Sequence, residues 1–390
     1  MRKVFSGFVK IVIRESGLIL NDFDIITMIL LAPLFYSLLY ASFYVNKTET
    51  KVPVVVVDLD KSLLSNQFIN SINQHQLIDV TERLENLNDI YDRLYSEKAE
   101  GAIIIPENFE SLLKSGKGTE IKLYLNTQRF LPSNDINKAV NEVVIEYGKQ
   151  MRLRAYNLNG VGLKQAEEIV EPIKDDVRFL FNPETTYGDF LIPAILVLIL
   201  QQTLFMGLGE SVAKENEQNS LNEWYNNANR SVSAAIAGKG VLYLIIFSCY
   251  SLFFFVMHFM IFKIKFIGSY FLLMIATIIF LISITGIAIF VASFFKRKVL
   301  ALQVISFTSY PLFFLTGYTW PAFSMPRVLQ WISDLIPGTP YFDIFTRISS
   351  MGADFPEIRP AFFHLVLLTI IILFAAAIRL NKIFKKSLIV

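Results

Sequence analysis

Few residues of this chain have the types and spacing that chemistry requires. Asp58 and Asp60 form an Asp-x-Asp pair directly after the apolar run VPVVVVD, a placement in which two carboxylates could bind a divalent cation. The alternative is a solvated turn after a strand, which we favour on residue types alone. His75 has neither a cysteine nor a second histidine near it, so a zinc site has no support.

Motifs typical of enzymes are missing. Gly116-Lys117-Gly118-Thr119 looks like a phosphate-binding loop, but it lacks the glycine that G-x-x-x-x-G-K-[ST] spacing requires upstream. No G-x-S-x-G sequence occurs either. We therefore expect no catalytic residue, no metal and no cofactor in this chain. A membrane-anchored enzyme with an outer active site is an alternative that no nucleophile–base pair supports.

A second group of polar residues lies within long apolar segments. Because polar side chains are costly in hydrocarbon, they tend to face the interior of a helix bundle. We interpret four of them as a candidate substrate path or dimer seam, with ordinary hydrogen bonding between helices as the alternative. No acidic or basic residue lies in the middle of an apolar segment, which argues against ion-coupled transport. The four residues are Gln201, Gln202, Gln303 and Thr308.

A charged segment, residues 210–232, separates two of the apolar segments. Its polar residues alternate with Leu221, Trp224 and Tyr225, a composition suited to docking into a groove of a partner protein. The alternative is a plain amphipathic loop. The candidate contact residues are Glu215, Glu217, Ser220, Leu221 and Trp224.

The elements that position these residues are long apolar segments with one polar insertion. A helix needs about 20 apolar residues to cross a bilayer, and the charged fraction of 18% is below the roughly 25% of soluble proteins. The fold class we expect is an α-helical polytopic membrane protein with an α/β domain inserted after the first helix. The six expected spans are Ile25–Val45, Phe190–Leu208, Ala234–Phe262, Phe266–Phe295, Val299–Trp320 and Phe362–Ile378.

The inserted domain, residues 46–187, is the polar stretch between the first two spans. It holds 17 Lys and Arg against 22 Asp and Glu, whereas the rest of the chain holds 19 against 12. Apolar β-branched runs such as Val52–Asp58 alternate with helical stripes such as Ser62–Asn73, which predicts a small α/β domain. We expect two further helices at Ser133–Ala155 and Leu163–Phe179. With Cys249 as the one cysteine, no internal disulfide can form, and no concentrated basic face indicates nucleic acid.

Two shorter segments complete the expected organisation. Residues 1–24 carry a partly helical apolar stripe, which we interpret as a cytoplasmic interfacial helix before the transmembrane helix at 25–45; a frayed tail is the alternative. Residues 188–390 hold spans two to six. Within them, the aromatic, proline-rich stretch 318–345 is too short to cross again and predicts a re-entrant outer segment.

The distribution of Lys and Arg predicts the orientation. With the N-terminus in the cytoplasm, 14 basic residues in short segments lie inside and 5 outside, as the positive-inside rule requires. The run Lys296-Arg297-Lys298 contributes most to this asymmetry. Both termini are then cytoplasmic, and residues 46–187 face outward.

Four motifs, in order, resemble those of ABC-2 type transporter permeases, in particular bacterial drug-export permeases with a large extracytoplasmic domain between spans one and two. They are VPVVVVDLDKSLLS with EGAIIIPENF; FNPE before FLIPAIL; GLGESVAKENEQNSLNEW; and GYTWPAFSMP with LIPGTPYFD. In this family the third motif reads roughly E-x-E-R-G-T-x-E and forms a helix that contacts the ATPase. Glu215 and Glu217 match its glutamates and Leu221 its apolar position, while Gln218, Asn219 and Ser220 replace Arg-Gly-Thr.

The resemblance implies an exporter subunit in the bacterial cytoplasmic (inner) membrane. The substrate would be a small amphiphile, a drug or a lipid-like molecule, moved out of the cytoplasm or the inner membrane. A separate ABC ATPase subunit would carry ATP and Mg²⁺, and a second permease copy or paralogue would complete a homo- or heterodimer, with a periplasmic adaptor and membrane lipid as further partners. The alternative is a non-transporting receptor or phage-attachment protein that presents its outer domain.

Overall fold

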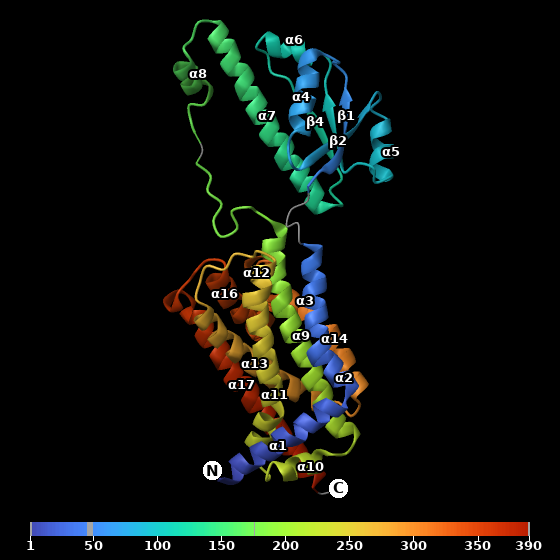
Figure 1. Ribbon diagram of the computed structural model, residues 1–390, viewed down its shortest axis with the longest axis vertical. Coiled ribbons are helices and arrows are strands. Elements are labelled where there is room, and N and C mark those ends of the chain that lie inside the picture. The colour runs from blue at the N-terminus through green and yellow to red at the C-terminus, as the bar shows by residue number, and fades with distance from the viewer. Residues whose placement is uncertain (1, 45–49, 175, 389–390) are drawn as a thin grey trace. The chain divides into compact units, whose positions relative to one another are not determined.

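The computed structural model describes residues 2–44, 50–174 and 176–388. The chain divides into two compact units (Figure 1). The helical unit comprises Met1–Lys47 and Phe179–Val390, and the inserted unit comprises Thr48–Arg178. The expected boundary between the first span and the inserted domain, at residues 45 and 46, lies outside the described residues.

The inserted unit is built on a four-stranded sheet. Its strands are β1 (Val52–Asp58), β2 (Ile78–Leu84), β3 (Gly101–Ile105) and β4 (Lys122–Leu125). They lie in the order β2-β1-β3-β4, with β1 parallel to both neighbours and β4 antiparallel to β3. The helices of this unit are α4 (Leu63–Asn73), α5 (Asp89–Tyr95), α6 (Phe109–Lys114), α7 (Phe130–Leu158) and α8 (Leu163–Val170).

Both faces of β1 are buried, as its unbroken apolar run predicts. Val54 and Val56 pack with Phe68 of α4 and residues of α7 on one face. Val55 and Val57 pack on the opposite face, beneath α5. The expectation of an α/β domain is thereby confirmed for the described residues, and Ser62 caps α4 in a capping box with Ser65.

Two helix boundaries in the inserted unit were predicted wrongly. Helix α7 begins at Phe130 rather than Ser133, because Pro132 lies in the first turn, where a missing N–H breaks no helical hydrogen bond. Helix α8 ends at Val170 rather than Phe179, since Pro172 disfavours helical backbone in the residue before it.

Among the described residues, the helical unit contains six helices that are long and apolar enough to cross a membrane. Two of them, the first and third, include π-helical turns. In chain order the spans are α2–η1–α3 (Phe23–Ile26, Thr27–Leu31, Ala32–Phe43), α9 (Tyr187–Glu217), α11–η2–α12 (Val232–Leu252, Phe253–His258, Phe259–Ile261), α13 (Tyr270–Ala292), α14 (Lys298–Leu315) and α17 (Phe355–Ser387).

Several spans differ in length from the sequence prediction. Helix α14 ends at Leu315 instead of Trp320, because Gly317 adopts a positive φ of 85° that a helix does not contain. Helix α17 has 33 residues and extends beyond the predicted 362–378 at both ends. The remaining helices of this unit are α1 (Arg2–Asn21), α10 (Leu221–Asn227), η3 (Ala322–Ser324), α15 (Arg327–Asp334) and α16 (Gly338–Ser349).

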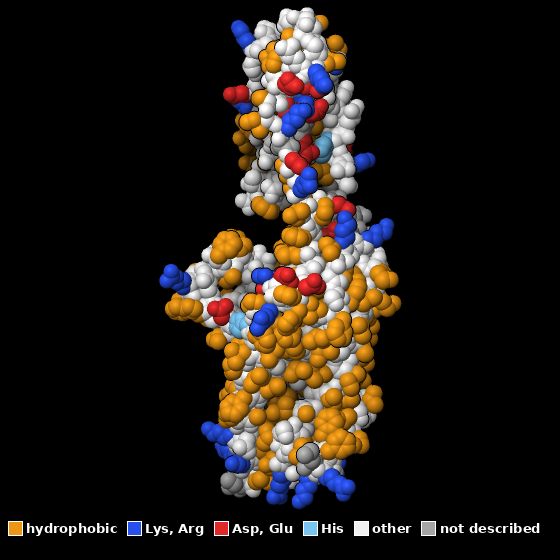
Figure 2. Space-filling view, turned by 90° about the vertical axis from the view of Figure 1, so that its left-hand side faces the viewer, with side chains coloured by type: hydrophobic (Ala, Val, Ile, Leu, Met, Phe, Trp, Pro, Cys, Tyr) orange, Lys and Arg blue, Asp and Glu red, His pale blue; other side chains and the backbone are white. Residues whose placement is uncertain are grey.

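Helices α9 and α13 form the centre of the helical unit. Their most apolar windows are 72% and 61% buried, against 22–33% for the other four spans. Figure 2 shows a broad surface of hydrophobic side chains on the visible face of this unit and a cluster of Lys and Arg at one end. Figure 1 places α1, α10 and the C-terminal end of α17 at that end. A hydrophobic belt with a basic end is the surface expected of a protein that spans a membrane.

Candidate functional site

Four charged side chains from three helices meet inside the helical unit and form a buried charge cluster: Arg14 and Glu15 of α1, Glu215 of α9 and Lys239 of α11. The Lys239 Nζ lies 2.7 Å from Glu15 Oε2 and 3.0 Å from Glu215 Oε1. Arg14 binds Glu215 through two nitrogens, at 2.5 Å and 3.0 Å. The exposed fraction of the side chain is 0% for Lys239, 1% for Glu15 and 2% for Glu215.

Polar and aromatic neighbours complete this charge cluster. Glu15 Oε1 accepts hydrogen bonds from the Ser211 hydroxyl at 2.6 Å and the Tyr243 hydroxyl at 3.2 Å. The Lys239 ammonium lies 4.9 Å from the centre of the Trp224 ring, within the range of a cation–π interaction. The carboxylates are therefore satisfied in a region without solvent, as buried charges require.

The sequence of α1 explains how Glu15 reaches the interior. Its buried residues are Gly7, Ile11, Glu15 and Ile19, which recur every four positions and so form one stripe along the helix. The stripe packs closely on α11, because a Cβ on Gly238 would lie only 2.7 Å from the Ile11 Cβ. Glu15 is the one charged member of an otherwise nonpolar stripe, so it needs a cation on the facing helix, which Lys239 provides.

Arg14 lies at the solvent edge of the charge cluster. Burial alone would lower the pKa of its guanidinium, but hydrogen bonds and attraction from Glu215 outweigh that effect and raise it. Arg14 Nε also binds Glu223 of α10 at 3.0 Å. One arginine thus connects the end of α9 with the following helix, α10.

Helix α10 is fixed on its other side by the end of α17. Phe384 stacks on Tyr225 at 4.6 Å between ring centres and lies edge-on to Trp224 at 5.2 Å. The amide of Asn222 donates to the Ser387 carbonyl at 2.6 Å and accepts from the Ser387 hydroxyl at 2.8 Å. A displacement of α10 would therefore act on α1, α9 and α17 together.

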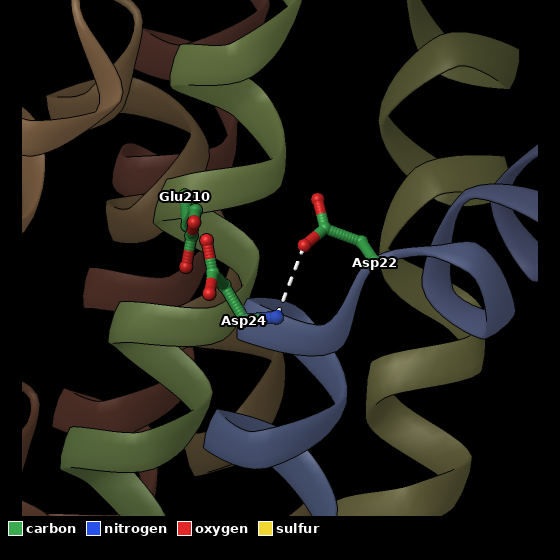
Figure 3. A group of neighbouring side chains, drawn as sticks. All are labelled: Asp22, Asp24 and Glu210. Carbon is green, nitrogen blue, oxygen red and sulfur yellow. Dashed lines mark hydrogen bonds between the residues drawn. The ribbon is translucent and has the colours of Figure 1, made fainter.

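A second group of charges joins the α1–α2 junction to α9 and α14. Asp22 caps α2 by accepting the backbone N–H of Asp24 (Figure 3), and it pairs with Lys214 of α9. The Lys298 ammonium lies 2.7 Å from Asp24 Oδ2 and 3.1 Å from Glu210 Oε1. Burial would raise the pKa of Asp22, but the hydrogen bond from Lys214 and its charge lower it below the ordinary value.

Asp22, Asp24 and Glu210 also have the spacing of cation ligands, since one oxygen from each lies within 4.8 Å of the others. Figure 3 shows the Asp24 carboxylate beside that of Glu210. However, the lysine ammonium groups already supply cations to all three carboxylates. We interpret this group as an ion-paired junction between helices.

The residues that we expected at a partner contact lie in and beside the charge cluster. Glu215 and Trp224 are buried, so neither can touch a partner directly. Ser220 donates its hydroxyl to Glu215, and Leu221 packs half-buried against the helical core. Glu217 is exposed, and its carboxylate accepts the backbone N–H of Lys298 at 2.7 Å.

The four residues that we expected along a substrate path are dispersed over two helices. Gln201 of α9 is buried, while Gln202 donates to the sulfur of Met206 one turn away. Gln303 of α14 is exposed, and Thr308 bonds to carbonyls of its own helix. Within residues 2–44, 50–174 and 176–388, no hydrogen bond joins any of these four side chains to another.

The Asp-x-Asp pair of the inserted unit has a structural role. Asp58 Oδ1 accepts the backbone N–H groups of Asp60 and Lys61, and its Oδ2 accepts the Ser65 hydroxyl at 2.7 Å. Asp60 accepts the N–H of Glu110 at 3.0 Å. The favoured interpretation, a turn after a strand, agrees with these bonds.

Sequence reasoning missed the charge cluster. In the sequence, Lys239 and Arg14 contribute only to the basic residues that indicate the orientation, and Glu15 belongs to none of the predicted sites. A signal was present nonetheless, since an acidic residue at the third position of the Gly7–Ile11–Glu15–Ile19 stripe predicts a buried counter-charge.

Comparison with known proteins gives consistent results. A sequence profile described as ABC-2 family transporter protein matches residues 23–379. The probable multidrug ABC transporter permease YbhR of Escherichia coli is 22% identical over 87% of this chain and 89% of its own length. The linearmycin resistance permease protein LnrN of Bacillus subtilis is 22% identical over 84% and 87%. ABC transporter G family member 20 of Dictyostelium discoideum is 22% identical over 97% of this chain, which spans about half, 51%, of that relative.

Proposed function

The chain belongs to the ABC-2 family of transporter proteins, as a membrane subunit, and from this premise we propose that it is the permease of an ATP-driven exporter. Its substrate would be a small amphiphile, a drug or a lipid-like molecule, moved out of the cytoplasm or the inner membrane. A separate ABC ATPase subunit would bind ATP and Mg²⁺ and supply the energy. A second permease copy or a paralogue would complete the transporter.

The observation that carries the proposal is the attachment of α10 to α1 and α9 through the buried charge cluster and to α17 through Phe384 and Ser387. Its exposed positions include Glu223 and Asn226, and the loop before it exposes Gln218 and Asn219, which together offer a polar surface to an ATPase. Movement of this surface would reach α9 through Glu215 and α1 through Arg14. Glu215, Ser220 and Trp224 would then transmit force from inside, while Glu217 and Leu221 border the contact.

The outer end of the helical unit supports the proposed substrate class. A cleft of about 700 Å³ lies there between the start of α9, α16 and α17, a volume in the usual range for small-molecule sites. Phe190, Tyr318 and Phe342 form one wall with ring centres 5.1–5.2 Å apart. The names of two relatives, a probable multidrug permease and a linearmycin resistance permease, support the same class.

The same proposal includes the orientation. The Lys and Arg side chains at the end that holds α1 and α10 support a cytoplasmic position for both termini and an outward position for the inserted unit. Gln201, Gln202, Gln303 and Thr308 remain candidates for the substrate path or for the seam with a second permease. An exposed glutamine such as Gln303 on a membrane-length helix favours the seam.

The test is purification of the complex from its native membrane in a gentle detergent. We expect a stoichiometric P-loop ATPase to co-purify, and the permeases present would distinguish a homodimer from a heterodimer. In Gln218→Trp/Asn226→Trp, two bulky rings on the exposed surface should abolish ATPase retention without changing thermal stability. The matched control is Met351→Trp, an exposed position just after α16, and it should retain the ATPase. Figure 1 places α16 at the end of the helical unit opposite α10.

Absence of any ATPase, even after cross-linking, would refute the exporter proposal. It would favour the alternative of a receptor or phage-attachment protein, for which the inserted unit would be the functional part. Retention of the ATPase by the double variant would refute the α10 surface alone.

A further inference from the structure

We propose that a groove between the N-terminal parts of α1 and α11 binds an anionic phospholipid of the cytoplasmic leaflet, with one acyl chain in the groove and the headgroup on basic side chains at its mouth. The inference goes beyond transport itself. It rests on the proposed orientation of α1 and requires neither the identity of the substrate nor that of the ATPase.

The groove lies towards the starts of α1 and α11, beside the close contact between the two helices. They meet where Gly238 lies against Ile11. Towards the start of both helices they leave an open groove of about 720 Å³. Its α1 wall is Val4, Phe5 and Phe8 and its α11 wall is Ser233, Ala234 and Ala237.

The groove is apolar and open to the surroundings. Phe5 is 69% exposed and Val4 is 43% exposed, and the small side chains of α11 leave room opposite them. Val9 and Ile13 continue the exposed apolar surface of α1 along the helix, one turn at a time. Such a helix lies in the membrane interface with its apolar side towards acyl chains, so the occupant is drawn from lipid.

Charge at the mouth of the groove selects the headgroup. Arg2 is a lining residue and Lys3 follows it, both exposed. The Asn229 amide donates to the Lys3 carbonyl at 2.8 Å, which fixes the start of α1 against the segment before α11. No aspartate or glutamate of the described residues lines the groove. Two adjacent cations, Arg2 in the lining and Lys3 beside it, without an acidic counterpart in the lining match a phosphate-bearing, net negative headgroup.

Lipid in this groove would also support the charge cluster. Arg14 and Glu15 lie on the same helix as Val4 and Phe5, so filling the gap between α1 and α11 stabilises the helix that carries them. An anionic lipid is therefore expected to strengthen the link between α10 and the spans, which makes lipid composition a regulator of the proposed coupling.

The experiment uses the full chain in detergent and a phosphatidylglycerol probe with a photoreactive acyl chain, with the phosphatidylcholine analogue as comparison. Cross-linked peptides are identified by mass spectrometry. We expect phosphatidylglycerol to label residues 2–9 and 232–238 with higher affinity than phosphatidylcholine. Each basic residue near a membrane surface contributes about 1 kcal/mol, or about fivefold, so Arg2→Gln/Lys3→Gln should weaken labelling about 25-fold.

A filling variant tests the groove itself. Ala237 is exposed, so Ala237→Trp should block labelling of residues 2–9 while thermal stability stays unchanged. Ile245→Trp adds the same ring at an exposed position of α11 beyond the groove and should leave labelling intact. Lys10→Gln removes a basic side chain of α1 that does not line the groove, and it is the control for charge. It should change labelling by less than twofold.

Equal labelling by both lipids would identify surrounding lipid without a specific site and would overturn the proposal. So would full labelling of Ala237→Trp. If the groove peptides cross-link to another protein in native membranes and not to lipid, the occupant is a protein and the proposal is wrong. ATPase retention is measured on the same samples, so a failure here is distinguishable from failure of the proposed function.

Discussion

Replacing Lys239 by methionine should destabilise the helical unit strongly. The Lys239 ammonium has no solvent exposure and is bound to Glu15 at 2.7 Å and Glu215 at 3.0 Å. In Lys239→Met, Glu215 keeps its two bonds to Arg14, at 2.5 Å and 3.0 Å. Glu15 keeps only hydroxyl donors, from Ser211 and Tyr243, and so becomes a buried carboxylate without a counter-ion.

The magnitude follows from that difference between the two glutamates. Removing one partner of a buried ion pair costs about 3–5 kcal/mol, because the other charge is left uncompensated. The loss in free energy of unfolding should arise almost entirely from Glu15, which is left without a counter-ion. In the double variant Glu15→Gln/Lys239→Met neither charge is present, so the free energy of unfolding should return to within about 1 kcal/mol of the native value.

The assay is reversible unfolding in mixed detergent micelles of increasing sodium dodecyl sulfate content, followed by circular dichroism. Lys382→Met, an exposed lysine of α17, is the control and should change the free energy of unfolding by less than about 0.5 kcal/mol. A Lys239→Met variant as stable as the native chain would refute the reasoning. A double variant no more stable than Lys239→Met would refute the assignment of the cost to Glu15.

Three further predictions address other contacts. Gly238→Leu should lower the free energy of unfolding by about 1–3 kcal/mol, because even the Cβ of the new side chain would lie 2.7 Å from the Ile11 Cβ. The protease sensitivity of α1 should rise as a result. The ion pair with Lys214 lowers the pKa of Asp22, so the stabilisation from this pair is present above the unfolded pKa of about 3.9 and is lost as pH falls through the lower folded pKa. Unfolding midpoints measured from pH 6 to 3 should show an acid-dependent loss in the native chain that is missing in Asp22→Asn. Phe384→Ala should lower the free energy of unfolding by about 3–5 kcal/mol and release α10 from α17. The variant should then retain less ATPase while its circular dichroism spectrum stays intact.

The spans could be predicted from sequence because hydrophobicity over about 20 residues is a local property. Their ends depend on single residues instead. Gly317 ends α14 through a positive φ, and Pro132 is accepted inside the first turn of α7, two effects that a hydropathy pattern does not contain. The inserted domain was predictable for the same reason as the spans, since β1 shows its double burial as an unbroken valine run.

The charge cluster could not be predicted in the same way. Glu15 and Lys239 are 224 positions apart, and their pairing depends on the close crossing of α1 and α11 at Gly238. The burial of Trp224 could not be predicted either. Its sequence context suggested a surface anchor, yet it is fully buried beneath Lys239 and against Phe384. Composition indicates that a segment is amphipathic, whereas tertiary packing decides which side faces out.

The attachment of α10 to α17 has a consequence for the order of biosynthesis. Helix α10 is translated soon after the second span, but Phe384 and Ser387, which hold it, follow every other span in the chain. Its final position is therefore reached only after the sixth span has entered the membrane. A partly synthesised chain presents α10 without this support, so under the proposed coupling an ATPase would find its complete contact surface only on the finished subunit.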